Sequence, residues 1–382
     1  MRRTAKRTSV VSMLMAIILM MSILAACGNG GNAEPASSAS SGTETKTDTA
    51  NGAAAGPAFP TDIDGLVAYE GDDRKEKLIE AAKKEGNLSL YTSMALEDME
   101  KVAAKFEEMY GIKVQIWRAG SENVLQRIVT EAQAGRFDYD VVETNGPELE
   151  ALHREQLLIP VKSPYLSDLI PEAITPHGGW TATRLNIFVQ AYNTSKLKKE
   201  DIPTTWEGLL DPKFKGLIAV EAEDIDWFAG VIKELGEEEG TKFFRDLVAT
   251  NGISLRKGHT LLTELVASGE VPYALTVYNY KAEQLKNDGA PLDWYAIEPA
   301  IARANGVGVA KNPKNPAAAV LFYDFMINEA QAFLAEIDFV PTSNKVDSSL
   351  NDMDIRFVDA GIILDEFDKW EALWQEIIME KK

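Results

Sequence analysis

The chain has 382 residues, of which 39 are Lys or Arg and 59 are Asp or Glu, so its formal net charge at pH 7 is −20. An acidic chain has no surplus of cations for neutralising phosphates, which excludes a general nucleic-acid binder. Because 45% of the residues are hydrophobic and 26% are charged, the chain can bury the core of roughly two domains, and disorder throughout is excluded.

Residues 1–26 have the pattern of a secretory signal. A basic start with Arg2, Arg3, Lys6 and Arg7 precedes an apolar run of 17 residues, from Val10 to Ala26, that only two serines interrupt. This length is short for a membrane span and fits the core of a signal peptide.

The only cysteine of the chain, Cys27, directly follows this run. The segment Leu24-Ala25-Ala26-Cys27-Gly28 resembles the lipobox of bacterial lipoproteins, in which the thiol receives a diacylglycerol. The resemblance implies a lipidated Cys27 and an anchor on the extracellular or periplasmic side of the cell membrane. The alternative is an uncleaved anchor with an incidental cysteine. A single cysteine excludes an internal disulfide and a thiolate metal site.

Residues 27–61 are rich in Gly, Ala, Ser, Thr and Asn and show no hydrophobic periodicity. Such a composition buries too little apolar area to offset the entropy lost on ordering. We therefore expect a flexible linker and a folded body that begins near Asp62.

Helix and strand patterns then alternate with short connections. Strands are predicted at 88–91, 112–117 and 139–142, and helices from Asp72 or Asp73 to Gly86, along the apolar face from Leu96 to Tyr110, and at 122–134. This order predicts an α/β lobe whose parallel sheet is covered by helices on both faces.

Three polar loops follow these strands. In open α/β sheets, ligands bind beyond the carboxyl ends of the strands, where helices begin. The loops therefore supply candidate ligand-binding residues, namely Tyr91, Thr92, Ser93, Arg118, Gly120, Ser121, Glu143 and Asn145. Capping of the following helices is the alternative for each of them.

A second alternating stretch predicts a second α/β lobe. Its strands are expected at 217–220, near Ile253 and at 273–277, with helices at 227–235 and 241–249. Segments 186–192 and 307–310 are expected to be strands that cross between the two lobes.

Several segments, in this order, resemble the solute-binding proteins of bacterial ABC importers, in the group that contains the iron(III)-binding proteins. Relatives in that group bind thiamine, polyamines or 2-aminoethylphosphonate. The resemblance covers residues 87–340 and rests on Leu90-Tyr91-Thr92-Ser93, Tyr110-Gly111-Ile112-Lys113-Val114, Ala191-Tyr192-Asn193-Thr194, Leu210-Asp211-Pro212-Lys213-Phe214-Lys215-Gly216, Gly269-Glu270-Val271-Pro272 and Ala318-Ala319-Val320-Leu321-Phe322-Tyr323-Asp324-Phe325.

Membership implies an α/β, two-lobed fold of the type II periplasmic-binding-protein kind, with crossing strands at the hinge and a ligand cleft between the lobes. The expected first lobe comprises 62–187 and 305–345, and the second 188–304 and 346–382. The implied function is a lipid-anchored, monomeric binder that delivers a small ligand to an ABC permease and its ATPase. The resemblance implies no resident cofactor, although iron(III) is a possible transported ligand.

Ligand identity depends on residues where this chain departs from its iron(III)-binding relatives. Those relatives hold the metal by adjacent tyrosines after a strand, usually with a histidine and an acid from the first lobe. Here the stretch reads Tyr278-Asn279-Tyr280, and the loop that would offer the histidine has none. Tyr280 and Glu143 are the candidate metal ligands, although Glu143 is about two positions from the expected acid. Iron(III), an iron chelate and a small organic anion stay open as ligands.

Other residues suit an organic ligand. Arg118, Arg256 and His259, with the helix start at Gly120 and Ser121, suit a carboxylate or phosphonate. Trp180, Trp227 and Tyr278 are candidates for stacking on a ring or cation, with core packing as the alternative for the tryptophans. A solvated surface is the alternative for Arg256, and a charged helix start is the simpler interpretation of Glu221, Asp224 and Asp226.

No nucleophile–base pair is assembled by the sequence. The part of the chain that follows Cys27 has no thiol, none of the common catalytic or nucleotide-binding motifs is present, and only three histidines are available. Binding without chemistry is therefore predicted, and a two-lobed enzyme is the least favoured alternative. A lipoprotein that presents its ligand to a sensor is the other alternative.

Overall fold

The computed structural model describes residues 59–348 and 353–380. The predicted signal peptide, the predicted lipidation site Cys27 and nearly all of the predicted linker lie outside the described residues. The description begins at Phe59, close to the expected start of the folded body.

The first sheet contains three parallel strands, β1 (Asn87–Thr92), β2 (Lys113–Arg118) and β3 (Val141–Asn145). β1 lies between β2 and β3, and the residues paired with Tyr91 are Trp117 and Val142. The predicted order of strands is therefore confirmed, although β3 ends three residues later than expected.

The second sheet contains another parallel group, β6 (Ile218–Glu221), β7 (Ser254–Arg256) and β8 (Tyr273–Tyr278), with β6 between the other two. β9 (Leu292–Tyr295) pairs antiparallel with β5. In both sheets, the carboxyl ends of the parallel strands lead into helices, which places six strand–helix connections where the two sheets face each other.

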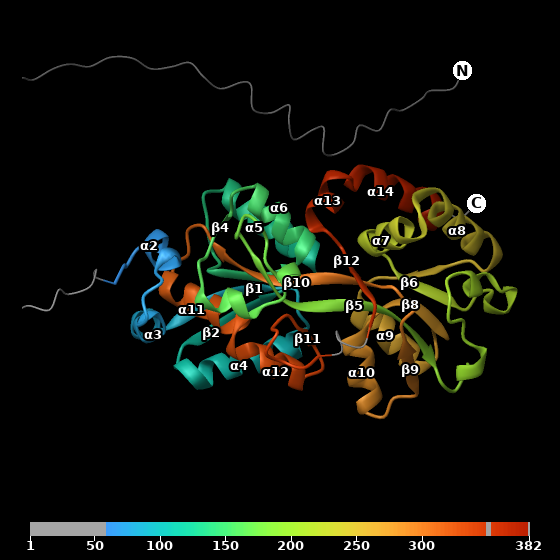
Figure 1. Cartoon of the computed structure of the whole chain (residues 1–382), viewed down its shortest axis with the longest axis horizontal. Helices are drawn as coiled ribbons and strands as arrows, with labels where there is room; N and C mark the ends of the chain where they lie inside the picture. Colours follow the sequence, from blue (N-terminus) through green and yellow to red (C-terminus); the bar gives the residue numbers. More distant parts are fainter. Residues whose placement is uncertain (1–58, 349–352, 381–382) are drawn as a thin grey trace, which may run out of the picture. The chain divides into compact units, whose positions relative to one another are not determined.

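Two long strands join the sheets, β5 (Thr181–Asn193) and β10 (Ala300–Ala310), and they pair antiparallel with each other (Figure 1). β10 also pairs with β3, and β5 also pairs with β8. The sheet is therefore mixed rather than purely parallel as predicted, because the crossing strands run against their neighbours. The two-lobed fold is confirmed, whereas the exact lobe boundaries stay a prediction.

Helices cover both sheets. Those of the first lobe are α2 (Ile63–Ala68), α3 (Arg74–Glu85), α4 (Leu96–Tyr110), α5 (Ser121–Gln133), α6 (Gly146–Arg154), α11 (Pro316–Ile327) and α12 (Glu329–Glu336). Those of the second lobe are α7 (Ile225–Leu235), α8 (Glu237–Thr250), α9 (His259–Ser268) and α10 (Asn279–Asn287). The chain ends in α13 (Ala360–Asp365), α14 (Phe367–Trp374) and a wide helical turn (Gln375–Met379).

Short elements complete the fold. The remaining strands are β4 (Leu158–Ile159), β11 (Val340–Pro341) and β12 (Ile355–Phe357), and single 3₁₀ turns occur at Pro164–Asp168, Pro171–Ala173, Lys199–Asp201, Glu207–Leu210 and Pro212–Phe214. Glycine ends α3 and α4 as predicted, because Gly86 and Gly111 adopt φ angles of 78° and 73°, which residues with a Cβ rarely adopt.

α11 forms the centre of the first lobe, since every residue from Ala317 to Ile327 is buried. Phe322 and Phe325 of α11 pack against Phe106 of α4, and the guanidinium of Arg74 forms a buried ion pair of 2.8 Å with Asp324. This packing fixes α3 and α4 against the sheet and so positions the loops that follow β1 and β2.

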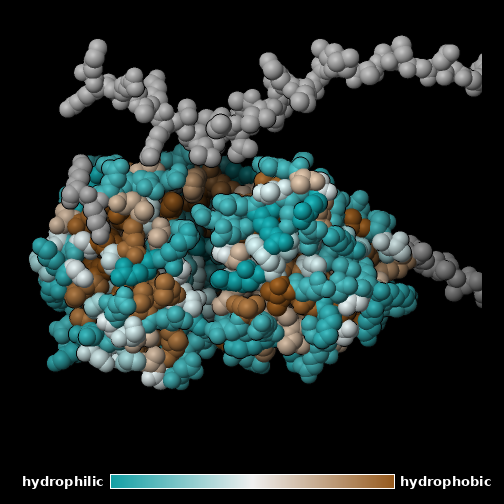
Figure 2. All heavy atoms as spheres, turned by 180° about the vertical axis from the view of Figure 1, so that it is seen from behind, coloured by the Kyte–Doolittle hydropathy of each residue, from teal (hydrophilic) through white to brown (hydrophobic). Residues whose placement is uncertain are grey.

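Figure 2 shows a mostly hydrophilic surface, broken by hydrophobic patches, on the face opposite to that of Figure 1. Among the residues that the structure describes, no helix has the length and apolar character needed to cross a bilayer.

Candidate ligand-binding cleft

A cavity of about 810 Å³ is lined by residues of both lobes. Its walls are the connections β1–α4, β2–α5 and β3–α6 of the first lobe, and β6–α7, β7–α9 and β8–α10 of the second. Side chains of the crossing strands β5 and β10 also line it, as do residues of α13 and α14. Helix N-termini from both lobes therefore border the same cavity, as expected for open α/β sheets.

The first-lobe wall, defined here as Ser93, Arg118, Gly120, Ser121 and Asn145, is small and polar. No side chain caps the N-termini of α5 and α6, which begin in this wall. The Asn145 amide donates to the Ser121 hydroxyl at 2.7 Å, and Arg118 Nε donates to the carbonyl of Met94 at 3.1 Å. Free helix amides beside a guanidinium favour an anionic group.

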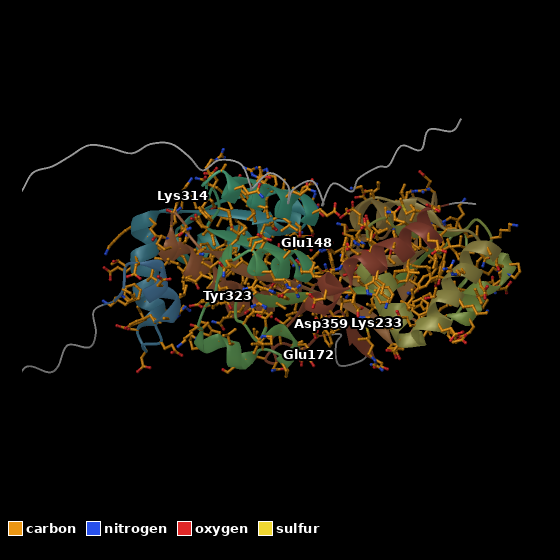
Figure 3. All side chains as sticks on the ribbon, turned by 90° about the horizontal axis from the view of Figure 1, so that it is seen from above. Glu148, Glu172, Lys233, Lys314, Tyr323 and Asp359 are labelled. Carbon is orange, nitrogen blue, oxygen red and sulfur yellow. The ribbon has the colours of Figure 1, made fainter. Side chains whose placement is uncertain are left out.

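Glu148 is a carboxylate in the first turn of α6, and it lies near the middle of the molecule in the view from above (Figure 3). Its side chain lines the cavity, yet its Oε2 atom is buried and has no hydrogen-bond partner in residues 59–348 and 353–380. Burial raises the pKa of Glu148 to about 7, although the positive charge of Arg303 opposes the shift.

The second-lobe wall, defined as Glu221, Asp224 and His259, has a different chemistry. Each residue offers one ligand atom, and these three atoms lie within 4.8 Å of one another. Glu221 is held in place because Oε1 accepts from the backbone N–H of Gly258 at 2.7 Å and Oε2 from that of Glu223 at 2.6 Å. Burial, followed by the neighbouring Asp224 charge, raises the pKa of Glu221.

His259 is oriented by its two ring nitrogens. Nδ1 lies 3.0 Å from the carbonyl of Thr276, which can only accept, so Nδ1 carries a proton. Nε2 lies 3.2 Å from Asp224 Oδ1, while Asp224 Oδ2 is buried without a partner. Burial alone would lower the pKa of His259, but the carboxylates of Asp224 and Glu221 outweigh it and raise the pKa. A backbone acceptor on one nitrogen is the usual support for a metal-binding histidine.

Arg303, from the crossing strand β10, connects this wall to the tyrosines. Its guanidinium donates to Asp226 Oδ2 at 2.5 Å, to Asp224 Oδ1 at 3.1 Å and to the Tyr278 hydroxyl at 2.8 Å. The Tyr278 ring stacks on His259 with 3.8 Å between ring centroids. Burial raises the pKa of Tyr278 well above its usual value and that of Tyr280 to about 12, so both phenols are protonated near neutral pH.

The crossing strands also place buried polar atoms without partners at the cavity. These are the side-chain oxygens of Asn186 and Asn305 and the Nε of Arg184. Together with Glu148 and Asp224, the cavity therefore presents four oxygen atoms and one donor that have no partner among the described residues. Buried polar atoms are rarely left unpaired, which makes this cavity a candidate site for a polar ligand.

Seven of the ligand-binding residues predicted from the sequence line the cavity: Ser93, Arg118, Gly120, Ser121, Asn145, Tyr278 and Tyr280. They come from four different connections of the two lobes. Whether they contact the ligand stays a prediction.

The other first-lobe candidates lie behind the wall. Tyr91 is buried and donates its hydroxyl to Glu131 at 2.9 Å, and the Thr92 hydroxyl donates to Glu143 at 2.5 Å. Glu143, the predicted metal ligand of this lobe, is fully buried and forms a 2.5 Å ion pair with Arg184. The structure therefore places Glu143 as the support of Arg184 and not in the lining of the cavity.

The remaining candidates also lie outside the cavity lining. Trp180 donates to Glu150, and Trp227 packs against Trp206 and Phe244, so both belong to the core as the alternative interpretation held. Within the described part of the chain, the Arg256 side chain forms one hydrogen bond, to the carbonyl of Leu255. Asn279 is buried and accepts from the backbone N–H of Ile187 at 3.3 Å.

Several cavity residues were not predicted. Four of them lie on strands that are buried along all or nearly all of their length, where polar residues at alternate positions are the only available signal: Arg184, Asn186, Arg303 and Asn305. Asp224 was interpreted as a helix start, and it does precede α7, but its side chain caps no N–H of that helix. Its Oδ2 atom, which has no partner among the described residues, is therefore available to a ligand.

Comparisons with known proteins agree with this geometry. The profile of the family described as bacterial extracellular solute-binding protein matches residues 101–352. The chain is similar to iron uptake protein A1 of a Synechocystis strain, with 25% identity over 291 residues, which is 72% of this chain and 80% of that protein.

Two solved structures show the same fold. Iron-bound HitA of Pseudomonas aeruginosa gives a TM-score of 0.67 at 23% identity, over 76% of this chain and 99% of that one. AfuA of Actinobacillus pleuropneumoniae, with fructose-6-phosphate bound, gives a TM-score of 0.69 at 24% identity, over 78% of this chain and all of that one.

Proposed function

Because the chain belongs to the bacterial extracellular solute-binding proteins, we propose that it captures an iron(III) chelate between its two lobes for an ABC importer. This membership confirms the family that the sequence predicted. Both the family and the fold are those of binding proteins. The proposal concerns the ligand and its delivery.

The cluster of Glu221, Asp224 and His259 is the observation that carries the proposal. Carboxylate oxygens suit a hard cation, and imidazole is an accepted ligand of iron. Two phenols lie beside the cluster, since Tyr278 stacks on His259 and the Tyr280 ring lies 5.9 Å from that of Tyr278. Iron(III) can displace their protons, because phenolates are hard oxygen donors. The similarity to iron uptake protein A1 supports the same ligand.

The size and polarity of the cavity favour a chelate over a bare ion. A space of about 810 Å³ far exceeds what one ion fills. The first-lobe wall offers free helix amides, Arg118 and, from the crossing strand, the unpaired Nε of Arg184. These donors suit the carboxylate or hydroxyl oxygens of a chelator whose metal lies at the second-lobe wall.

Delivery follows from the resemblances. We propose that closure of the lobes buries the chelate and that the closed form docks on a permease with its ATPase. Cys27 carries the lipid that keeps the protein at the extracellular or periplasmic face of the membrane. Replacement of Cys27 by serine should release the protein from the membrane fraction, and retention of the variant would contradict the anchor.

A small organic anion without metal is the second candidate. The donors of the first-lobe wall favour it, because they need no metal to bind a carboxylate or phosphate. It predicts that binding survives loss of Asp224 and His259, which separates it from the iron chelate.

Calorimetric titration of the purified protein with iron(III) citrate, iron(III) nitrilotriacetate and each chelator alone tests the proposal. We expect binding of the iron complexes and a rise in melting temperature, because a ligand that binds only the folded state stabilises it. Equal affinity for the chelator with and without iron would favour the organic anion, and no binding of any iron complex would refute the proposal.

A further inference from the structure

The C-terminal helices α13 and α14 lie beyond the segment that the family shares. The family match ends at residue 352, and α13 begins at Ala360. α13 packs against α6 of the first lobe and α14 packs against α7 of the second (Figure 1). This C-terminal segment therefore spans the two lobes above the cavity.

Ion pairs tie the segment to both lobes. Arg154 of α6 contacts Asp365 at 2.6 Å, and Lys233 of α7 contacts Glu366 at 2.9 Å. The rings of Trp370 and Trp374 are buried, with 0% and 1% exposure. The segment is therefore an integral part of the fold.

The segment contributes an apolar surface to the cavity. The apolar side chains of Ile363, Leu364, Phe367 and Trp374 line it, beside Glu371 and Gln375 of the same segment. Phe367 is nevertheless 38% exposed, and Leu261, which lines the same cavity at the start of α9, is 46% exposed. Large apolar side chains that stay exposed in a cavity are typical of a binding surface.

This apolar surface and the metal-binding cluster belong to one space. His259 and Leu261 both belong to the first turn of α9, and both line the cavity. When the metal of a bound ligand lies at Glu221, Asp224 and His259, the side of the ligand towards the C-terminal segment faces apolar side chains. A chelator made only of carboxylates would leave that wall in contact with water.

We propose that the C-terminal segment and the start of α9 together form an apolar subsite, made by Phe367, Leu364 and Leu261, which holds an aromatic or alkyl group of the chelator. The inference rests on the proposed function and narrows its ligand to iron(III) complexes of chelators with an apolar group. Phe367 is the main contact, because an aromatic ring offers the largest apolar area and a face for stacking. It is a specificity-determining residue that the family match does not include.

Two iron(III) complexes that differ by one group test the subsite: acetohydroxamate, which carries a methyl group, and benzohydroxamate, which carries a phenyl ring. The hydroxamate oxygens that bind iron are the same in both. We expect the purified protein to bind the phenyl complex about tenfold more tightly, as burial of one further ring face predicts.

Substitution Phe367→Ala should remove most of this preference and change the affinity for the methyl complex by less than about twofold. Leu364→Ala should reduce the preference in part and serves as the second variant if the first is unstable. Phe357→Ala is the matched control, because Phe357 is also 38% exposed and belongs to the same C-terminal region but lines a separate cavity of about 270 Å³.

The outcomes separate the two proposals. A phenyl preference that Phe367→Ala removes and Phe357→Ala retains supports the subsite. Binding of both complexes with equal affinity, or a preference that survives Phe367→Ala, overturns the subsite and leaves the iron chelate intact. Failure of both complexes to bind overturns the proposed function and the subsite with it.

Discussion

The two walls of the cavity are built from the same kind of connection but hold different chemistry. The first-lobe wall has small hydroxyl and amide side chains beside free helix N-termini. The second-lobe wall has two buried carboxylates and an oriented imidazole, and stacked tyrosines lie beside it. One wall suits an anion and the other suits a cation, so the pair suits a metal chelate, which presents both.

The comparison also separates acids that support the fold from acids that are available to a ligand. Glu143 and Asp224 are both fully buried. Both Glu143 oxygens have protein partners, whereas Asp224 keeps one oxygen without any. Burial alone therefore does not distinguish the two acids, whereas the unpaired oxygen of Asp224 in the cavity lining does.

The largest effect is expected at Glu143. Substitution Glu143→Ala leaves Arg184 buried without its counter-ion, which should lower the free energy of unfolding by about 3–5 kcal/mol. Urea unfolding followed by circular dichroism measures this. The surface acid Glu80, paired with Lys84, is the control and should change stability by less than about 0.5 kcal/mol when replaced by alanine. If Glu143→Ala and Glu80→Ala lost similar stability, Glu143 would not be an acid that supports the fold.

The next effect concerns the second-lobe wall. Asp224→Asn and His259→Gln each remove one proposed metal ligand, so affinity for iron(III) citrate should fall about 100-fold. The matched control is His153→Gln, because His153 stacks on His177 in the first lobe and does not line the cavity. Retained affinity in the Asp224 and His259 variants would place the metal elsewhere.

We expect Glu148 to make the stability of the ligand-free protein depend on pH. The pKa of Glu148 is raised to about 7 in the folded state, from an ordinary value of 4.5. Between these two values the folded protein holds a proton on Glu148 that the unfolded chain has released. Stability should therefore fall as the pH rises from about 5 to 8. In Glu148→Gln, the loss of stability over this pH range should be smaller by about 2 kcal/mol. This figure is less than the full pKa shift implies, because solvent that reaches the cavity screens the charge. An unchanged pH profile of unfolding in Glu148→Gln would show that the carboxylate has a partner.

The smallest effect compares two arginines. Arg118 lines the first-lobe wall and Arg256 does not. Arg118→Ala should weaken binding of iron(III) citrate about fivefold, as loss of one partly screened contact with an anion predicts, and Arg256→Ala should change it by less than twofold. Titration of both variants under the same salt conditions decides the comparison, and a larger loss in Arg256→Ala would contradict the assignment of the wall.

Much of the fold could be predicted from local patterns. Helix α4 has its predicted bounds, because its apolar face is regular and Gly111 ends it. The crossing strands were predicted too short, at 186–192 for β5 and 307–310 for β10. Strands buried on both faces have no alternation of polar and apolar residues, and Thr181 to Arg184 of β5 are buried although three of them are polar or charged.

The first-lobe wall could be predicted because each polar loop directly follows a strand of regular pattern. The second-lobe wall depends on pairings between distant segments. Arg303 meets Asp224 and Asp226 only because β10 returns through the centre of the molecule. Residues 346–382 were expected to belong to the second lobe. They line the cavity because α13 packs on the first lobe and α14 on the second. Such contacts have no local signal in the sequence.

X-ray diffraction from crystals grown with iron(III) citrate, recorded at the iron absorption edge, tests the central claim most directly. The anomalous signal locates the metal independently of the rest of the ligand. We predict one strong peak within bonding distance of a carboxylate oxygen of Glu221, of Asp224 and of His259 Nε2, with the chelator extending towards the first-lobe wall. A peak at the first-lobe wall, or density for the organic anion with no iron peak, would contradict the account.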